Sequence, residues 1–348
     1  MKKHLFYITA AALAVLCSCN SDDEATQAQQ PSQIRLTSTL EGNVTRSFDA
    51  ANIPVNNTVW VWADQINASN SIRSVYFKAW KLTTDGNGSL SSTKAKNYPA
   101  TNGLDFFGLK GNFNTTIDEG TTELPVYDVE KELDGIIHVI EPDQTTSADY
   151  YKSDLLYAQL KEQTATNSAA ELNFYHMLSR VQIVLIPRNG GTNNNLLGTT
   201  DLQSATVTIL GVKNKVKFTA DRSVDINNEE TGRALREAML TIPATDNEAT
   251  SILVKTETSM AEDLTDSGYG DAIVAPKQTF AAGTRFIQVD YMGETTYFTL
   301  ADDLTLESGK RYRFKLFIDR IGHTYTVRPT IADWNDVDGG EMWVESNE

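Results

Sequence analysis

Apolar side chains recur at every second position from Gln33 onward, and this alternation limits the fold more than any other feature. The segment 33–40 carries three of them on one face: Ile34, Leu36 and Leu40. A period of two is typical of a strand with one buried face. By the same pattern, or by a short apolar run, we expect further strands at 59–62, 75–82, 136–140, 172–175, 180–186, 205–210, 216–219, 252–255, 284–290, 295–300, 312–319 and 324–327. Only 231–240 has a convincing helical pattern.

The order and spacing of these strands predict an all-β chain. Strands separated by Gly, Asn and Asp turns are typical of β-sandwiches. The helix–strand alternation of a parallel nucleotide-binding sheet is missing from the sequence. A length of 348 residues favours two domains. The polar stretch 161–169 separates two strand regions, so we expect tandem β-sandwich domains at 33–165 and 166–348.

The first eighteen residues are predicted to be a signal peptide. Lys2 and Lys3 precede an apolar run, Leu5 to Leu16. As a helix this run would span about 18 Å, which is short of the roughly 30 Å hydrocarbon core of a bilayer. A cleaved targeting segment therefore fits better than a membrane anchor.

The residues around the two cysteines favour a lipoprotein. Leu16-Cys17-Ser18-Cys19 resembles the lipobox of bacterial lipoproteins, with Cys19 as the residue that would be acylated. The alternative is an ordinary secreted protein with two incidental cysteines. Residues 19–32 form a polar, acidic linker. Its acidic cluster resembles a surface-export signal, although a merely solvated linker has the same composition.

Composition and motifs argue against catalysis. The net charge of -16 disfavours binding to nucleic acid, because phosphates require a basic face. Phosphate-binding glycine loops, His-Glu-x-x-His and Gly-x-Ser-x-Gly are missing, the body has no cysteine, and its histidines are isolated. The segment 333–339 resembles a calcium loop but has Val344 where the loop needs Glu. We therefore expect no enzyme activity, catalytic residue, cofactor or metal.

The tryptophans offer one alternative function. Trp60 and Trp62 lie two apart on a predicted strand and would share a face, and Trp80 lies on the next strand. Such rings could stack on sugars, as in a surface glycan-binding lipoprotein of a nutrient-uptake system. Aromatic residues inside apolar runs are more often core residues.

Several segments, in order, resemble the fimbrillin family, the pilin-like subunits of type V pili and their relatives. The most specific is Phe174–Val181, which resembles a family strand of the form F-x-H-x-L-S-R followed by an apolar residue. In 273–278 the match is imperfect, because Lys277 stands where Gln often follows Pro directly. The other matching segments are 34–37 with 44–46, 98–99 with 104–107, 153–158, 308–312 and 331–334.

The resemblance implies transthyretin-like topology for both sandwiches and export as an outer-membrane lipoprotein that later enters a fimbrium. It also implies that an Arg-specific surface protease cuts after Arg46 and removes the lipidated segment from Cys19 with the first strand. A donor strand from a neighbouring fimbrial subunit would then fill the groove. The removable strand carries Ile34, Leu36 and Leu40. The candidate donor residues are Tyr325, Val327, Ile331, Trp334 and Trp343.

These implications predict a structural or adhesive subunit of a type V pilus. Its partners would be other fimbrial subunits, the protease, the membrane before processing, and a host or bacterial surface receptor. Two alternatives stay open at this point. The C-terminal residues could instead complete the second sandwich, and the chain could be the glycan-binding lipoprotein described above.

Overall fold

A computed structural model of the chain describes residues 32–41, 52–67, 73–126, 135–187, 204–228, 230–256, 270–291, 293–318, 324–327 and 329–333. The predictions for the signal peptide, Cys19, Arg46, Trp334 and Trp343 fall outside these residues. All described residues belong to one contact unit, Pro31–Glu348. No helix among them is long and apolar enough to span a membrane.

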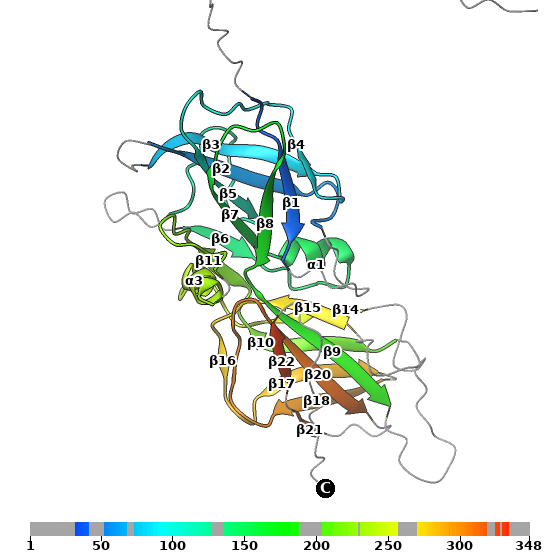
Figure 1. Cartoon of the computed structure of the whole chain (residues 1–348). Coiled ribbons are helices and arrows are strands. Elements are labelled where there is room, and N and C mark those ends of the chain that lie inside the picture. Colours follow the sequence, from blue (N-terminus) through cyan, green and yellow to red (C-terminus); the bar gives the residue numbers. More distant parts are fainter. Residues whose placement is uncertain are drawn as a thin grey trace, which may run out of the picture. The chain divides into compact units, whose positions relative to one another are not determined.

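Seven strands from the first half of the sequence pair into a closed ring (Figure 1). Their order is β1-β4-β3-β2-β5-β7-β8, so the first and last strands of the ring in sequence are neighbours. The ring consists of β1 (Leu36–Leu40), β2 (Thr58–Ile66), β3 (Arg73–Thr84), β4 (Ser89–Ser91), β5 (Leu104–Lys110), β7 (Leu156–Gln163) and β8 (Ala170–His176).

Aromatic packing explains why β5 and β8 come close in this barrel. Every residue of β5 is buried, and Gly108 lies in its middle. A Cβ atom on Gly108 would lie 2.7 Å from Cζ of Phe174 on β8, so only glycine leaves room for the ring. Phe174 and Phe106 belong to one apolar cluster inside the barrel. Its other buried members are Ile34, Leu36, Ile53, Val59, Val61, Ala63, Phe77, Trp80, Leu82, Tyr98, Leu104, Leu156, Ala158, Ala170 and Leu172.

Two five-stranded sheets hold most of the second half of the chain. One has the order β13 (Thr250–Leu253), β10 (Thr206–Val212), β17 (Arg285–Tyr291), β18 (Glu294–Leu300), β21 (Thr324–Val327). The other has the order β14 (Lys255–Thr256), β15 (Gly270–Val274), β9 (Ser179–Pro187), β20 (Lys310–Ile318), β22 (Thr330–Asp333).

Strand β9 is central in its sheet, as its apolar residues on both faces predict. Val181, Ile183 and Leu185 join the larger apolar cluster of the chain. On the other face, Arg180 donates two hydrogen bonds to the Asp271 carboxylate, at 3.0 and 2.9 Å. A paired and hydrogen-bonded charge is the form in which an ionised side chain is tolerated in a core.

The remaining elements are short. β6 (Ile136–Val139) pairs with β11 (Lys215–Phe218), which pairs with β12 (Leu240–Thr241). The helical pattern at 231–240 is confirmed by α3 (Gly232–Ala238). A second helix, α1 (Ser147–Ser153), begins where the Thr146 side chain accepts a hydrogen bond from the Asp149 N–H. A two-stranded ladder joins β16 (Thr279–Phe280) to β19 (Leu304–Thr305).

The prediction of an all-β chain is confirmed, since the described residues form mainly strands. The two tandem transthyretin-like sandwiches stay a prediction. The polar stretch 161–169 contains the end of β7 and the loop to β8, and these two strands pair antiparallel in the barrel. The division of the chain between residues 165 and 166 likewise stays a prediction.

Candidate functional site: the first strand and its groove

Strand β1 lies between two other strands of the barrel (Figure 1). It runs parallel to β8, with five residue pairs from Leu36↔Ala170 to Leu40↔Phe174. On its other side it runs antiparallel to β4, with Leu36 opposite Leu90. The ring therefore closes through β1, and its removal would leave β4 and β8 as free edges.

The inward face of β1 carries the residues that the alternation predicted. Ile34 and Leu36 are buried, with Leu36 3% exposed, and both belong to the barrel cluster. Leu40 is partly buried and packs against the same cluster. Each fully buried side chain of this kind stabilises the fold by roughly 1.5–3 kcal/mol. The structure thus brings the three residues together, and their removal by a protease stays a prediction.

Ser38 is an inward residue that the apolar pattern does not reveal. It is 1% exposed, and its N–H donates a 2.7 Å hydrogen bond to the Gly88 carbonyl. Gly88 has a φ of +95°, and a Cβ atom there would lie 2.9 Å from the backbone carbonyl oxygen of Ser38. A larger residue at Gly88 would therefore push β1 away from the turn before β4.

Backbone hydrogen bonds hold the segment before and after β1 as well. The Ile34 N–H donates to Lys96 O at 2.8 Å, and the Glu41 N–H donates to Phe174 O at 2.8 Å. The exposed residue Arg35 lies between these points, and its carbonyl accepts from the Ala170 N–H at 2.9 Å. A cut after Arg35 would therefore require local opening and would leave most of β1 in place.

The end of β1 also makes polar contacts on its outward side. Thr39 Oγ1 donates to Glu171 Oε1 on β8 at 3.0 Å. Two residues later, Glu41 Oε2 lies 3.7 Å from Arg236 Nη2 on α3. Glu41 and Arg236 both line a polar cavity of about 470 Å³.

The described candidate donor residues, Tyr325, Val327 and Ile331, belong to strands at the ends of sheets. β21, which contains Tyr325 and Val327, pairs parallel with β18. β22 pairs antiparallel with β20, with Ile331 opposite Tyr312. Ile331 is 53% exposed. Within the described part of the chain, both strands thus occupy edges, and their donation to a neighbour stays a prediction.

Residues 45–334 match the fimbrillin-like family. The chain belongs to this family. No curated protein matches the sequence. Among solved structures, a proposed cell adhesion protein from Bacteroides ovatus is 15% identical, with 89% of this chain and 100% of that chain covered and a TM-score of 0.55. A second, from Bacteroides uniformis, is 16% identical, with 87% and 98% covered and a TM-score of 0.52. At this identity the two structures support the fold.

The tryptophans of this fimbrillin-like chain do not form the sugar-stacking platform considered from the sequence. Trp62 is buried, and its Nε1 donates to Thr122 O at 2.8 Å. Trp80 is also buried, and its Nε1 donates to Lys94 O at 2.8 Å. Trp60 is partly buried against the larger apolar cluster. The core interpretation is therefore correct for Trp62 and Trp80.

A cluster of buried or partly buried polar side chains lies at the end of β8. His176 Nδ1 lies 3.0 Å from the Asp154 carboxylate, and Lys110 Nζ donates to the Tyr151 and Asp154 carbonyls. Burial would raise the pKa of Asp154, but His176 and Lys110 outweigh it and lower that pKa. Burial lowers the pKa of Lys110 to about 8. Lys110 and Asp154 are buried, so these contacts do not form a site open to substrate, although Asp154 Oδ1 has no hydrogen-bond partner among the described residues.

His138 belongs to the same buried region. Its Nδ1 accepts from the Asn112 N–H at 3.0 Å, and its Nε2 lies 2.8 Å from Ser153 O. Burial lowers its pKa to about 4, because the charged imidazolium would lose its hydration there. The described residues contain no group of three or more His, Cys, Asp or Glu placed to hold a metal ion.

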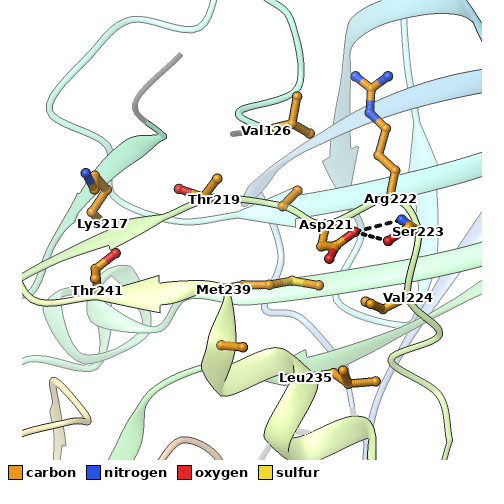
Figure 2. A pocket seen from close by; sticks show the side chains of 12 residues that line it. Val126, Lys217, Thr219, Asp221, Arg222, Ser223, Val224, Leu235, Met239 and Thr241 are labelled. Atoms are coloured by element: carbon orange, nitrogen blue, oxygen red, sulfur yellow. Dashed lines mark hydrogen bonds between the residues drawn. The ribbon is translucent and has the colours of Figure 1, made fainter. Parts of the chain in front are cut away.

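A second cavity, of about 670 Å³, lies beside α3 and β11. Figure 2 shows its side chains, with the Asp221 carboxylate accepting hydrogen bonds from the Ser223 N–H and hydroxyl. Arg222 also lines this cavity, and its Nη1 lies 3.1 Å from Oδ2 of Asp64 on β2. The apolar residues that line the cavity are Val126, Ala220, Val224, Leu235, Ala238 and Met239.

Proposed function

We propose that this chain is a structural or adhesive subunit of a cell-surface type V pilus. In this proposal it is exported as a lipoprotein through Cys19, cut after Arg46, and joined to other fimbrial subunits by donor-strand exchange. Membership of the fimbrillin-like family supports the general assignment. The observation that carries the mechanism is the place of β1, which closes the barrel between β4 and β8.

Loss of β1 would make the remaining barrel a receptor for another strand. It would uncover the apolar cluster against which Leu36 packs, together with the unpaired backbone groups of β4 and β8. An extended segment satisfies both needs at once, because its backbone completes the ladder and its alternate side chains fill the pockets. A contact of this head-to-tail kind need not close on itself, and where it does not, its repetition gives a filament.

Arg46 is a better cleavage point than Arg35. A cut after Arg46 detaches all of β1, whereas Arg35 is bonded into the barrel through its carbonyl. The donor, in the same proposal, comes from the C-terminal region of a neighbouring subunit. Among the described candidates, Ile331 lies on the edge strand β22 and is exposed.

The test is limited digestion of the purified precursor with an Arg-specific protease, followed by intact mass and an unheated SDS gel. We expect loss of the segment that ends at Arg46, and SDS-resistant species from the cut chain alone or mixed with other fimbrial subunits. Arg46→Gln is the matched control and should stay uncut and monomeric, whereas Arg35→Gln should behave as wild type. A precursor that resists the protease, or a cut chain that never associates, would overturn the mechanism.

A glycan-binding lipoprotein is less consistent with the structure. That function relied on exposed tryptophan rings, and Trp62 and Trp80 are buried with their N–H groups engaged inside the fold.

A further inference from the structure

The polar cavity at the end of β1 joins the removable strand to a fixed part of the molecule. Glu41 supplies one wall, directly after β1. The other walls come from β7, β8, α3 and the loop before α3, through Gln159, Glu171, Asn173, Tyr175, Asn228 and Arg236, among others.

Arg236 is held in a fixed position at this cavity. Its side chain is 9% exposed, and its guanidinium lies 3.9 Å from the centre of the Tyr175 ring. Its Nη1 donates to Ile226 O at 2.7 Å, and its Nη2 lies 3.7 Å from the Glu41 carboxylate. Stacking and the carbonyl contact do not involve β1. The guanidinium therefore keeps its place when the strand leaves but loses the Glu41 carboxylate.

A second polar contact lies two residues before Glu41. The Thr39 hydroxyl donates to Glu171 on β8, and Asn173 Oδ1 lies 3.5 Å from the same hydroxyl. Thr39 and Glu41 point to the same side of the extended chain, because side chains alternate along a strand. The outward face at the end of β1 thus presents a hydroxyl and then a carboxylate to fixed acceptor and donor groups.

We propose that Arg236 selects the strand that replaces β1 by pairing with a carboxylate at the position of Glu41. This inference rests on the proposed strand exchange and names the chemistry of the partner. The replacing strand needs Asp or Glu at the position of Glu41, and Ser or Thr at the position of Thr39 would add the weaker contact to Glu171. On its inward face it needs apolar residues at the positions of Ile34, Leu36 and Leu40, and a small residue at Ser38.

The chain's own C-terminal segment does not fit this pattern. Each acidic residue from Asp333 onward, when placed at the position of Glu41, brings a charged residue to at least one of the inward positions of Ile34, Leu36 and Ser38. With Glu348 in that place, for example, Glu345 falls at the buried position of Ser38, where a charged side chain is not accommodated. The occupant is therefore a strand of a different fimbrial subunit that carries the pattern.

The test is a competition assay on the protein cut after Arg46. The probe is a fluorescent peptide of residues 32–46 of this chain, which carries the full pattern of β1. Its unlabelled competitors are the same peptide, its Glu41→Gln and Leu36→Asp variants, and a peptide of residues 324–348. Each is measured on wild-type protein and on Arg236→Gln, with Arg236→Lys as a second variant that keeps the charge if Arg236→Gln does not fold.

We expect the Glu41→Gln peptide to compete about fivefold less well than the wild-type peptide, as for a partly exposed ion pair. On Arg236→Gln protein the two peptides should differ by less than about twofold, because the double-mutant comparison removes the pair itself. High salt should reduce the difference on wild-type protein. The 324–348 peptide should compete poorly.

The outcomes separate this inference from the function on which it rests. Equal competition by the wild-type and Glu41→Gln peptides, with failure of Leu36→Asp, overturns the role of Arg236 and leaves strand exchange intact. Strong competition by the 324–348 peptide overturns the choice of partner. A probe that does not bind, or a Leu36→Asp peptide as potent as the wild type, overturns strand exchange and this inference together.

Discussion

β1 and β22 are short strands near opposite ends of the described chain, but they are built into their sheets differently. β1 is bonded on both sides, to β4 and β8, and it closes a ring. Among the described strands, β22 is bonded to β20 and lies at the end of its sheet. Leu36 of β1 is 3% exposed, whereas Ile331 of β22 is 53% exposed.

The difference shows that the length of a strand does not determine how much the strand contributes to the stability of the fold. A strand bonded on both sides satisfies its own backbone groups and those of two neighbours, and it fills a core with its inward side chains. An edge strand satisfies one neighbour and can leave at a lower cost. The chain thus combines one strand whose removal opens a core with another whose removal exposes an edge.

The largest expected effect comes from a charge placed in each strand. Leu36→Asp should lower the free energy of unfolding by more than about 3 kcal/mol, because it buries a carboxylate without a partner. Ile331→Asp should change it by less than about 0.5 kcal/mol, because that side chain faces solvent. Urea titrations of both variants at pH 7 measure these free energies of unfolding. Equal losses in the two variants would contradict the difference between β1 and β22.

Acid should destabilise the fold through His138, which lies on β6. In the native state this histidine has a pKa of about 4, well below its ordinary 6.5. Between these values the unfolded chain binds a proton that the native chain does not, so stability falls as pH falls from about 6.5 to about 4. The loss should reach about 3 kcal/mol.

Urea titrations between pH 7 and pH 4 test this effect against His138→Gln. The variant should be less stable than wild type at pH 7, because it disturbs the contact to Ser153, but it should lose less on acidification. The same slope in both proteins would assign the acid sensitivity to other groups. Asp154, with its lowered pKa, acts below this window in both proteins.

Alanine substitutions at two glycines test how closely β1 must approach the turn before β4. Gly88→Ala should lower the free energy of unfolding by about 2–3 kcal/mol. Its φ of +95° is unfavourable for alanine, and the new Cβ atom would meet the backbone carbonyl oxygen of Ser38. Gly120→Ala, with a φ of +82° and open space around it, should cost about 1 kcal/mol. Thermal unfolding of the two variants compares them directly. A Gly120 variant as unstable as the Gly88 variant would show that φ alone matters.

The smallest expected effects are on the outward surface. Thr39→Val removes the contact to Glu171, and Thr279→Val removes a 3.0 Å contact to Thr305 between β16 and β19. Each should change the free energy of unfolding by about 0.5 kcal/mol or less, because exposed hydroxyls can bond to water instead. Calorimetry of both variants would show whether β1 and the C-terminal sheets differ in stability only through their buried side chains. A large loss of stability in Thr39→Val alone would show that the outward face of β1 contributes as well.

Alternation along the sequence located the strands with one buried face. It identified β1 through Ile34, Leu36 and Leu40, and the central strand β9 through its continuous apolar run. It missed β5, because all seven residues of β5 are buried and Gly108 interrupts its β-forming residues. It also treated 252–255 as one strand, although its residues divide between β13 and β14 in different sheets.

The candidate site was only partly visible in the sequence. The inward apolar residues of β1 were predicted, but Ser38 looks like an ordinary polar residue until the barrel closes around it. The closure pairs Leu36 with Ala170, and no local pattern encodes a contact so distant in sequence. Arg236 was hidden for the same reason, since its partner Glu41 lies in another half of the chain.

The mixed pairing of β1 gives its place in the barrel a direction. The strand runs with β8 and against β4, and parallel and antiparallel ladders space their N–H and C=O groups differently. A reversed strand would meet both neighbours with the wrong spacing. Joints made through this place would all point the same way, so a filament assembled from them has two unlike ends and gains new subunits by a different reaction at each.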